Sequence, residues 1–273
     1  MNKEMIENFI DYLCENEKCQ NTIIKYQRDL YVFLEFLNER SLEKKIVREY
    51  KNFLMKKYAP RSVNSMLTAL NSFFDYIERR DLKVKVLRIQ KKIFINENKN
   101  LTKNEYKRLL HAAHDDVRLQ LIMETLCSTG MRVSELQYIT VENYKSGEIE
   151  VFNKGKERTI FLSKKLIQKM KIYIQQKKIK KGKIFVTKTG KPMDRISIWR
   201  SMKQLCQKAQ VQSSKVFPHN LRRLFARSYY SLKKDLSKLA DLLGHTSIET
   251  TRIYIMEDSK KHYRDIEDMN LII

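Results

Sequence analysis

The sequence predicts a mainly helical protein with a small antiparallel β-sheet, divided into two domains. The chain has 273 residues, which is long for one compact core and sufficient for two. Its first part contains no glycine, since all six glycines lie at or beyond Gly130, and its apolar residues recur with a helical period. Alternation of apolar and polar residues, which is typical of strands, is found between Gly147 and Leu162.

The N-terminal part is expected to form a small bundle of about four helices. Leu30, Phe33, Leu34 and Leu37 are spaced at i, i+3, i+4 and i+7, so they share one helix face. A second apolar stripe follows a break at Pro60 and contains Val63, Met66, Leu67, Leu70, Phe73, Phe74 and Ile77. We therefore predict a helical domain over residues 1–93, followed by a polar linker over residues 94–100.

The second domain is expected over residues 101–273, with helices and a hairpin. Thr102 and Glu105 have the spacing of a capping box, which opens a helix that runs to about residue 113. A buried helix is predicted next, over residues 117–128. It is followed by a β-hairpin of residues 148–152 and 157–162, a third short strand at 184–187, and helices from Trp199 onward.

The composition gives no sign of a metal, a cofactor or a membrane segment. The four cysteines lack the paired spacing of a zinc site. No stretch approaches the roughly 20 apolar residues that cross a bilayer. The N-terminus carries acidic residues where a signal peptide would carry basic ones. We therefore expect a soluble, cytoplasmic protein that needs no metal and no cofactor.

The net charge of +23, from 55 basic and 32 acidic residues, predicts a polyanionic partner. Nucleic acid and an anionic membrane surface are the candidates. The densest run, from Ser163 to Lys191, contains eleven lysines and no acidic residue. Any one of these lysines is more simply a solvated charge. Together they repel one another unless a partner offsets them, which favours a polyanion over the simpler explanation.

Five short motifs contain the residues that can do chemistry. In order they are Thr-Gly-Met-Arg-Val-Ser-Glu-Leu (129–136), Lys-Gly-Lys-Glu-Arg (154–158), Pro-His-Asn-Leu-Arg (218–222), Leu-Leu-Gly-His (242–245) and Thr-Thr-Arg-Ile-Tyr (250–254). Each motif alone has a simpler explanation. Arg132 and Glu135 have the spacing of an ion pair on a helix. Lys154 is typical of a solvated charge in a turn, Gly244 of a helix C-cap, and Tyr254 of a packed aromatic side chain.

Together, these residues supply what is needed to cleave a phosphodiester without a metal. Two arginines can make bidentate, permanently charged contacts with the non-bridging oxygens. A lysine can protonate the leaving 5′ oxygen, provided that nearby cations lower its pKa. A tyrosine can attack phosphorus where the same cations favour its ionised form, and histidines can move its proton. The sequence offers no carboxylate cluster fit for two metal ions.

The order and wording of the five motifs resemble the tyrosine recombinase (phage integrase) family, most closely its short Xer-like members. The resemblance covers most of the chain. It implies an N-terminal helical core-binding (SAM-like) domain and an α+β catalytic domain. It also implies a site-specific recombinase that cleaves DNA through a 3′-phosphotyrosyl intermediate and exchanges strands via a Holliday junction, without metal or ATP. Integration, excision, inversion and dimer resolution all remain open.

The same resemblance assigns roles to single residues. Arg132 and Arg222 match the arginines that clamp the phosphate, and Tyr254 matches the nucleophile. Lys154 matches the hairpin lysine that protonates the leaving oxygen. Lys156 is the alternative, because the turn is one residue shorter than in Xer-like relatives.

Three further residues complete the implied site. His219 matches the general acid/base, and His245 matches the second histidine that supports the phosphate. Glu135 resembles the acidic residue that buttresses the site without taking part in the chemistry. One departure is Arg223, where many relatives carry histidine, so a mobile-element integrase fits as well as a chromosome-dimer resolvase.

Additional basic residues are expected to bind the DNA, namely Lys156, Arg158, Arg223, Lys177, Lys178, Lys180 and Lys181. The expected partners are double-stranded DNA with an inverted-repeat recombination site, other copies of the chain in a synaptic tetramer, and an accessory directionality factor. No membrane is expected.

Two other functions use similar residues. A non-catalytic DNA-binding protein would have lost Arg132, Arg222 or Tyr254, and none is lost; the compact motif spacing argues against a type IB topoisomerase.

The segment around the tyrosine suggests how its position is controlled. Thr246 and Glu249 have the spacing of a capping box, so a helix is expected just after His245, with Tyr254 two turns along it. A short helix set apart in this way can present or withdraw its tyrosine, and the resemblance suggests that half of the sites cut at once. The apolar tail, residues 269–273, is expected to dock on its own domain or on a neighbouring protomer.

Overall fold

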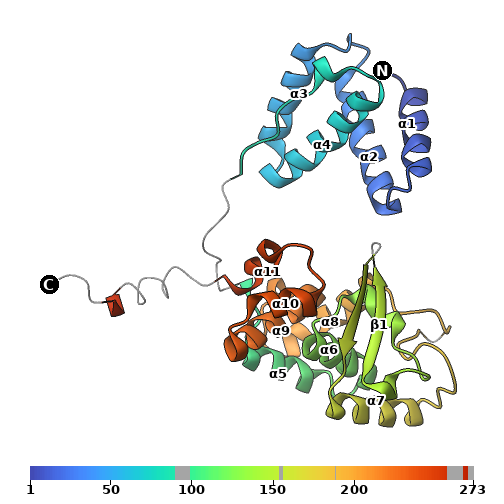
Figure 1. The fold of residues 1–273 in the computed structure, drawn as a ribbon, viewed down its shortest axis with the longest axis vertical. Coiled ribbons are helices and arrows are strands. Elements are labelled where there is room, and N and C mark those ends of the chain that lie inside the picture. The colour runs from blue at the N-terminus through green and yellow to red at the C-terminus, as the bar shows by residue number, and fades with distance from the viewer. Residues whose placement is uncertain (90–98, 154–155, 188, 257–266, 270–273) are drawn as a thin grey trace. The chain divides into compact units, whose positions relative to one another are not determined.

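The computed structural model describes residues 1–89, 99–153, 156–187, 189–256 and 267–269. Two compact units divide the chain, Met1–Lys91 and Lys92–Ile273, which we call the N-terminal and C-terminal units. The prediction of a mainly helical protein with a small antiparallel sheet is confirmed (Figure 1). The expected linker at residues 94–100 lies mostly outside the described residues, so its bounds stay a prediction.

Four helices make up the described part of the N-terminal unit. They are α1 (Lys3–Glu15), α2 (Gln20–Leu37), α3 (Lys44–Lys57) and α4 (Pro60–Tyr76), followed by the 3-10 turn η1 (Arg80–Leu82). Pro60 occupies the first turn of α4, where its missing N–H leaves no helical hydrogen bond unmade. Both predicted apolar stripes face a common core, in which Phe9, Phe33, Phe73 and Phe74 are fully buried.

The first half of the C-terminal unit leads from two helices into the hairpin. Its elements are α5 (Lys103–Ala112), α6 (Val117–Thr129), the 3-10 turns η3 (Val133–Tyr138) and η4 (Tyr144–Ser146), β1 (Glu148–Asn153) and β2 (Lys156–Phe161). The predicted capping box is confirmed, since Glu105 N–H donates to Thr102 Oγ1 and Thr102 N–H donates to Glu105 Oε2. Gly130 ends α6 in the left-handed conformation, with φ of 65°, which glycine adopts without strain.

The two strands pair antiparallel with a register that separates buried from exposed side chains. Val151 lies opposite Arg158, and Ile149 lies opposite Ile160. Ile149, Val151 and Ile160 are buried in the core, whereas Phe152 and Phe161, on the other face, are more than half exposed. Because side chains alternate between faces, Arg158 belongs to the buried face. A basic side chain is therefore directed into the unit.

The second half of the unit is helical. Its elements are α7 (Lys164–Gln176), α8 (Arg195–Lys208), η5 (Ser213–Lys215), α9 (Pro218–Lys233), α10 (Leu236–Leu243) and α11 (Ile248–Ile255). Helix α9 packs against α6 and also against α10 and α11 (Figure 1). Tyr254 on α11 joins Leu239, Leu243 and Ala226 in a small apolar cluster of its own. These contacts bring four of the predicted motifs to one place.

Three local expectations are wrong. Residues 184–187 form no strand, because the backbone makes only two isolated bridges, Lys183 with Thr140 and Val186 with Pro192, on either side of the buried Ile184 and Phe185. Helix α8 begins at Arg195, four residues before Trp199, because the Asp194 carboxylate caps it. Helix α11 begins at residue 248 with Ser247 as N-cap and no side-chain cap hydrogen bond, so the expected capping box is not formed.

Candidate active site

Glu135 lies at the centre of the site and is completely buried. It stands in the first turn of η3, where Arg132 is the N-cap residue. The backbone N–H of Arg132 donates to Glu135 Oε2 at 2.6 Å, and its guanidinium Nη1 donates to Oε1 at 2.9 Å. Burial alone would raise the pKa of Glu135, but the Arg132 N–H and the charge of Arg158 hold this pKa below its usual value. The carboxylate is therefore ionised at neutral pH.

Arg158 is the second arginine on this carboxylate. Its Nη2 donates to Glu135 Oε2 at 2.6 Å, and its Nη1 donates to the carbonyl of Leu242 in the last turn of α10. Only 11% of its side chain is exposed. The guanidinium is therefore bound inside the unit, and the expectation that it binds DNA stays an untested prediction.

Arg222 on α9 is buried and holds the loops that carry two other motifs. It donates from Nη1 to the carbonyl of Gly130 and from Nη2 to the carbonyl of Leu243, both at 2.5 Å. The same Nη2 lies 3.0 Å from His245 Nε2. Burial and the nearby charge of Arg132 lower the pKa of Arg222 to about 10, and Tyr254 acts in the opposite direction. Arg222 remains charged at neutral pH and interacts electrostatically with the tyrosine.

The hydrogen bonds of His245 define its protonation state. An arginine has no acceptor atom, so His245 Nε2 must accept from Arg222 and carries no proton. The proton is then on Nδ1, which lies 2.8 Å from Thr251 Oγ1 and donates to it. Burial, with the positive charges of Arg222 and Arg132, lowers the pKa of His245 to about 4. His245 is therefore neutral at physiological pH.

Tyr254 packs between the two histidines. Its ring centroid lies 5.2 Å from that of His219 and 5.2 Å from that of His245. The guanidinium carbon of Arg223 lies 5.9 Å from the centre of the same ring, within reach of a cation–π contact. Tyr254 is only 8% exposed. The tyrosine is thus packed among the histidines and arginines of the same chain.

His219 completes the group from the first turn of α9. Its side chain is exposed to solvent on the surface of the unit. Even so, loss of water where the ring packs, with the positive charges of Arg223 and Arg222, lowers its pKa to about 4. Solvent contact screens part of these charges. A neutral imidazole therefore faces the tyrosine ring.

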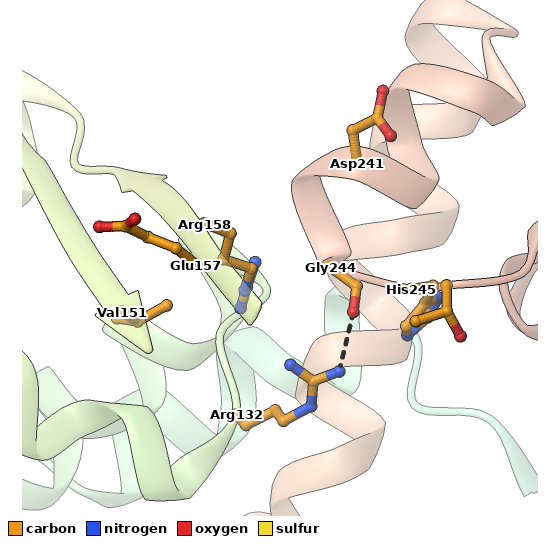
Figure 2. A pocket seen from close by; sticks show the side chains of 8 residues that line it. Arg132, Val151, Glu157, Arg158, Asp241, Gly244 and His245 are labelled. Atoms are coloured by element: carbon orange, nitrogen blue, oxygen red, sulfur yellow. Dashed lines mark hydrogen bonds between the residues drawn. The ribbon is translucent and has the colours of Figure 1, made fainter. Parts of the chain in front are cut away.

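A cavity of about 330 Å³ opens beside these groups. It lies between β2, which contributes Glu157 and Arg158, and the end of α10, which contributes Asp241 and Gly244 (Figure 2). Arg132 points its guanidinium across the floor of the cavity, where Nη2 donates to the Gly244 carbonyl at 3.2 Å. Through this cavity an anion can reach the guanidinium groups of Arg132 and Arg158.

The charge balance of the site favours an anion. Four arginines, Arg132, Arg158, Arg222 and Arg223, lie in the site against three carboxylates, the buried Glu135 and the cavity-lining Glu157 and Asp241. Both histidines are neutral, so they add no further positive charge. Such a surplus is costly unless a negative group occupies the site, and a phosphate with several oxygens suits the forked donors of arginine. Among the described residues, no cluster of His, Cys, Asp and Glu could hold a metal ion.

Several predicted residues have no described contact with this cluster. Lys154 falls outside the described residues, and the side chain of Lys156 does too, although its backbone belongs to β2. The four lysines expected to bind DNA, Lys177, Lys178, Lys180 and Lys181, are exposed in the segment that follows α7. None of them takes part in the contacts described above.

Sequence reasoning missed Thr251 and the main-chain acceptors. Thr251 is fully buried and binds His245 Nδ1. Its spacing was the available signal, because a hydroxyl three residues before Tyr254 lies on the same side of the helix. The carbonyls of Gly130, Leu243 and Gly244 gave no signal, since every residue carries one.

Fold and site together define a class: enzymes that bind a phosphodiester with arginines and place a tyrosine beside it. Two family models match the chain, "Phage integrase family" over residues 99–261 and "Phage integrase, N-terminal SAM-like domain" over residues 6–81. The chain belongs to the phage integrase family of tyrosine recombinases. It is a site-specific recombinase that cleaves and rejoins DNA strands through a covalent tyrosyl intermediate.

The curated relatives match over nearly their whole length. Tyrosine recombinase XerA of Pyrococcus furiosus is 32% identical, over 100% of this chain and 96% of the relative. Tyrosine recombinase XerD of Vibrio cholerae is 29% identical, over 92% of this chain and 90% of the relative.

Solved structures show the same fold. The XerH site-specific recombinase bound to difH substrate has a TM-score of 0.73 at 20% identity, covering 100% of this chain and 85% of that one. A lambda integrase (75–356) dimer bound to a COC′ core site has a TM-score of 0.75 at 17% identity, covering 94% and 96%. The described part of the chain contains no helix long and apolar enough to cross a lipid bilayer.

Proposed function

We propose that Tyr254 is the nucleophile of the recombinase and that duplex DNA carrying a recombination site is its substrate. The position of the Tyr254 ring between His219 and His245, beside the buried Arg222, carries the proposal. The phenol oxygen attacks phosphorus, the bond to the 5′ oxygen breaks, and a 3′-phosphotyrosyl bond forms. The 5′ hydroxyl of a partner strand reverses the step. The bond energy stays in the covalent intermediate, so the exchange needs no ATP.

The two arginines that match the family motif bind the scissile phosphate in this proposal. Arg132 is 37% exposed at the cavity and keeps N–H groups beyond those that bind Glu135 and Gly244. The guanidinium of Arg222 donates hydrogen bonds to the carbonyls of Gly130 and Leu243, so it is already oriented before DNA binds. Donors that need no rearrangement stabilise the charge that develops in the transition state most effectively.

The histidines and the hairpin lysine handle the protons. His219 is neutral and next to the tyrosine, so it can accept the phenol proton. His245 is fixed by Thr251 and orients Arg222 toward the phosphate. Lys154, in the sequence motif between the two strands, is proposed to protonate the leaving 5′ oxygen. The supporting argument for Lys154 is its place in the motif.

The wider proposal concerns domains and assembly. Residues 1–93 are proposed as a core-type DNA-binding domain, 94–100 as linker, and 101–273 as the catalytic domain. Lys156, Arg223 and the exposed lysines after α7 are proposed to bind the DNA backbone. We propose further that copies assemble as a tetramer on inverted-repeat sites in the cytoplasm, with an accessory directionality factor where one direction is favoured. The excess of positive charge supports the DNA contacts.

A nicked suicide DNA tests the nucleophile. We expect the wild-type chain to form a denaturation-resistant adduct on candidate sites from its genomic neighbourhood, and Tyr254→Phe to form none. Tyr229→Phe is the matched control, because Tyr229 packs against the same apolar cluster and should keep the adduct. An adduct that survives in Tyr254→Phe would rule out this tyrosine. Equal cleavage of unrelated supercoiled DNA, with relaxation and no strand exchange, would favour a topoisomerase instead.

A further inference from the structure

Arg158 is bound at both ends of its guanidinium by groups of the protein itself. It lies opposite Val151 on the buried face of the hairpin. One end donates to the Glu135 carboxylate, and the other donates to the Leu242 carbonyl. An arginine that binds DNA phosphates needs N–H groups that reach the surface, whereas this side chain is 11% exposed. The Nε–H group of Arg158, which makes neither of these contacts, is buried as well.

Arg158 and Arg132 both connect Glu135 to the end of α10. Both arginines bind Glu135, at 2.6 Å and 2.9 Å. Both also bind carbonyls at the end of α10, Arg158 at Leu242 and Arg132 at Gly244. Carbonyls in the last turn of a helix have no partner within that helix, so they are available as acceptors. One carboxylate and one helix end are thus linked twice.

Arg158 packs directly against Gly244, where a side chain would not fit. A Cβ atom at position 244 would lie 2.4 Å from Arg158 Cδ and 2.9 Å from its Nε, too close for real atoms. The backbone there also has φ of +61°, which favours glycine independently. The glycine that precedes His245 therefore leaves room for the arginine side chain. This close fit indicates that Arg158 belongs to the site's internal framework.

We infer that Arg158 is a positioning residue: it ties strand β2 to the end of α10 and holds Glu135 and Arg132 in place, rather than binding DNA. The inference rests on the function proposed above, since it concerns the same phosphate site. A lysine cannot replace Arg158, because one ammonium group cannot span two acceptors as a planar fork does. Loss of the fork should slow the chemical step, since a shift of about 1 Å costs on the order of 100-fold in rate.

The first test separates cleavage from binding in Arg158→Lys, which keeps the charge. We expect single-turnover cleavage at saturating protein to fall roughly 10- to 100-fold. The Kd for duplex DNA and its salt dependence should stay within about twofold. Normal cleavage would overturn the inference. So would weaker duplex binding with unchanged cleavage at saturation, because that pattern marks a contact with the DNA itself.

The matched control is Arg108→Lys on α5. The Arg108 guanidinium also joins two carbonyls, Ala209 at 3.0 Å and Gln210 at 3.2 Å, but α5 carries none of the site residues. Its cleavage rate should equal that of the wild type. A similar loss in both variants would show that any lost arginine fork slows the enzyme and would overturn the special role of Arg158.

A double-mutant cycle with Gly244→Ala tests the contact without relying on activity. The added methyl group displaces Arg158, so Gly244→Ala and Arg158→Lys should disturb the same link. We expect the losses in thermal unfolding temperature and in cleavage to be non-additive, with the double variant close to the worse single variant. Additive losses would overturn the inference. Failure of the wild type to form an adduct would instead count against the proposed function, while the unfolding cycle would still report the contact.

Discussion

Among the described residues, each unit buries one carboxylate, Asp29 in the N-terminal unit and Glu135 in the C-terminal unit. Asp29 pairs within its own helix, with Lys25 one turn earlier and with Arg28 at 3.3 Å. The side chains of Lys25 and Arg28 are 34% and 72% exposed, so water also solvates them.

Glu135 has partners of a different kind. Arg132 is a neighbour in sequence, but Arg158 comes from a strand 23 residues later and is nearly buried. Arg222 lies in the same electrostatic environment and is buried too. The charge of Asp29 is balanced by Lys25 and Arg28, so this ion-pair group needs no further ligand. Glu135 thus has two arginine partners with a third arginine nearby, so N–H groups of these arginines remain available for a ligand with negative charge.

Neutralising the two carboxylates should produce the largest contrast. Glu135→Gln leaves the buried Arg158 without its anion, so we expect a loss of about 3–5 kcal/mol in the free energy of unfolding, together with loss of cleavage. Asp29→Asn leaves only cations that water reaches, and should cost about 1 kcal/mol or less. Urea unfolding followed by circular dichroism and by fluorescence measures both variants.

The fluorescence of Trp199 shows whether a loss of stability belongs to the C-terminal unit. Trp199 is the one tryptophan of the chain and lies on α8, so its fluorescence reports the C-terminal unit. Glu135→Gln should shift the fluorescence transition, and Asp29→Asn should leave it in place. Equal losses in the two variants would show that the surplus of arginines adds nothing to the cost, and the comparison would fail.

Removal of Arg222 should give the next largest effect. Arg222→Ala takes away a preorganised donor, so single-turnover cleavage should fall roughly 100- to 1000-fold. Duplex binding should change little, because many other basic residues supply it. Lys45→Ala, an exposed lysine of α3 in the N-terminal unit, should leave cleavage at saturating protein unchanged. An Arg222→Ala variant that loses affinity as strongly as rate would contradict this division.

The smallest effect is a pH dependence confined to the C-terminal unit. All five histidines lie beyond residue 110, and the pKa values of His219 and His245 are lowered to about 4 by burial and neighbouring arginines. The unfolded chain binds protons near pH 6.5, so it holds more of them than the folded chain between pH 6.5 and 4. The stabilisation is complete above pH 6.5 and is lost as the pH falls toward 4.

Thermal unfolding at pH 7.5 and pH 5 tests this sign. The transition followed by Trp199 should move to lower temperature at pH 5 by a few degrees, about 2–4 °C per kcal/mol. His245→Asn should reduce that shift. A shift toward higher temperature at pH 5, or one that His245→Asn leaves unchanged, would show that the lowered pKa of His245 does not control stability.

Local signals in the sequence predicted much of the fold because their causes are local. The capping box at Thr102 and the helix predicted over residues 117–128 depend on hydrogen bonds and dihedral angles within a few residues, and both are confirmed. The segment 184–187 was mispredicted because its neighbours decide it: Phe185 is buried next to Ile184, and the backbone binds different partners on each side. At Thr246 the capping spacing was present, yet the backbone enters α11 one residue later.

For the site, the sequence by itself determined which chemical groups are available and the order of the motifs that carry them. It singled out Arg132, Arg222 and Tyr254 as candidates, and the resemblance to the family gave them their expected roles. Only the tertiary structure decided where each guanidinium points. Arg158 looked like a surface cation and is instead directed inward, because its strand register places it on the buried face and Gly244 leaves space for it. The direction of a charged side chain depends on acceptors far away in sequence, Glu135 and Leu242 here, and no local pattern records them.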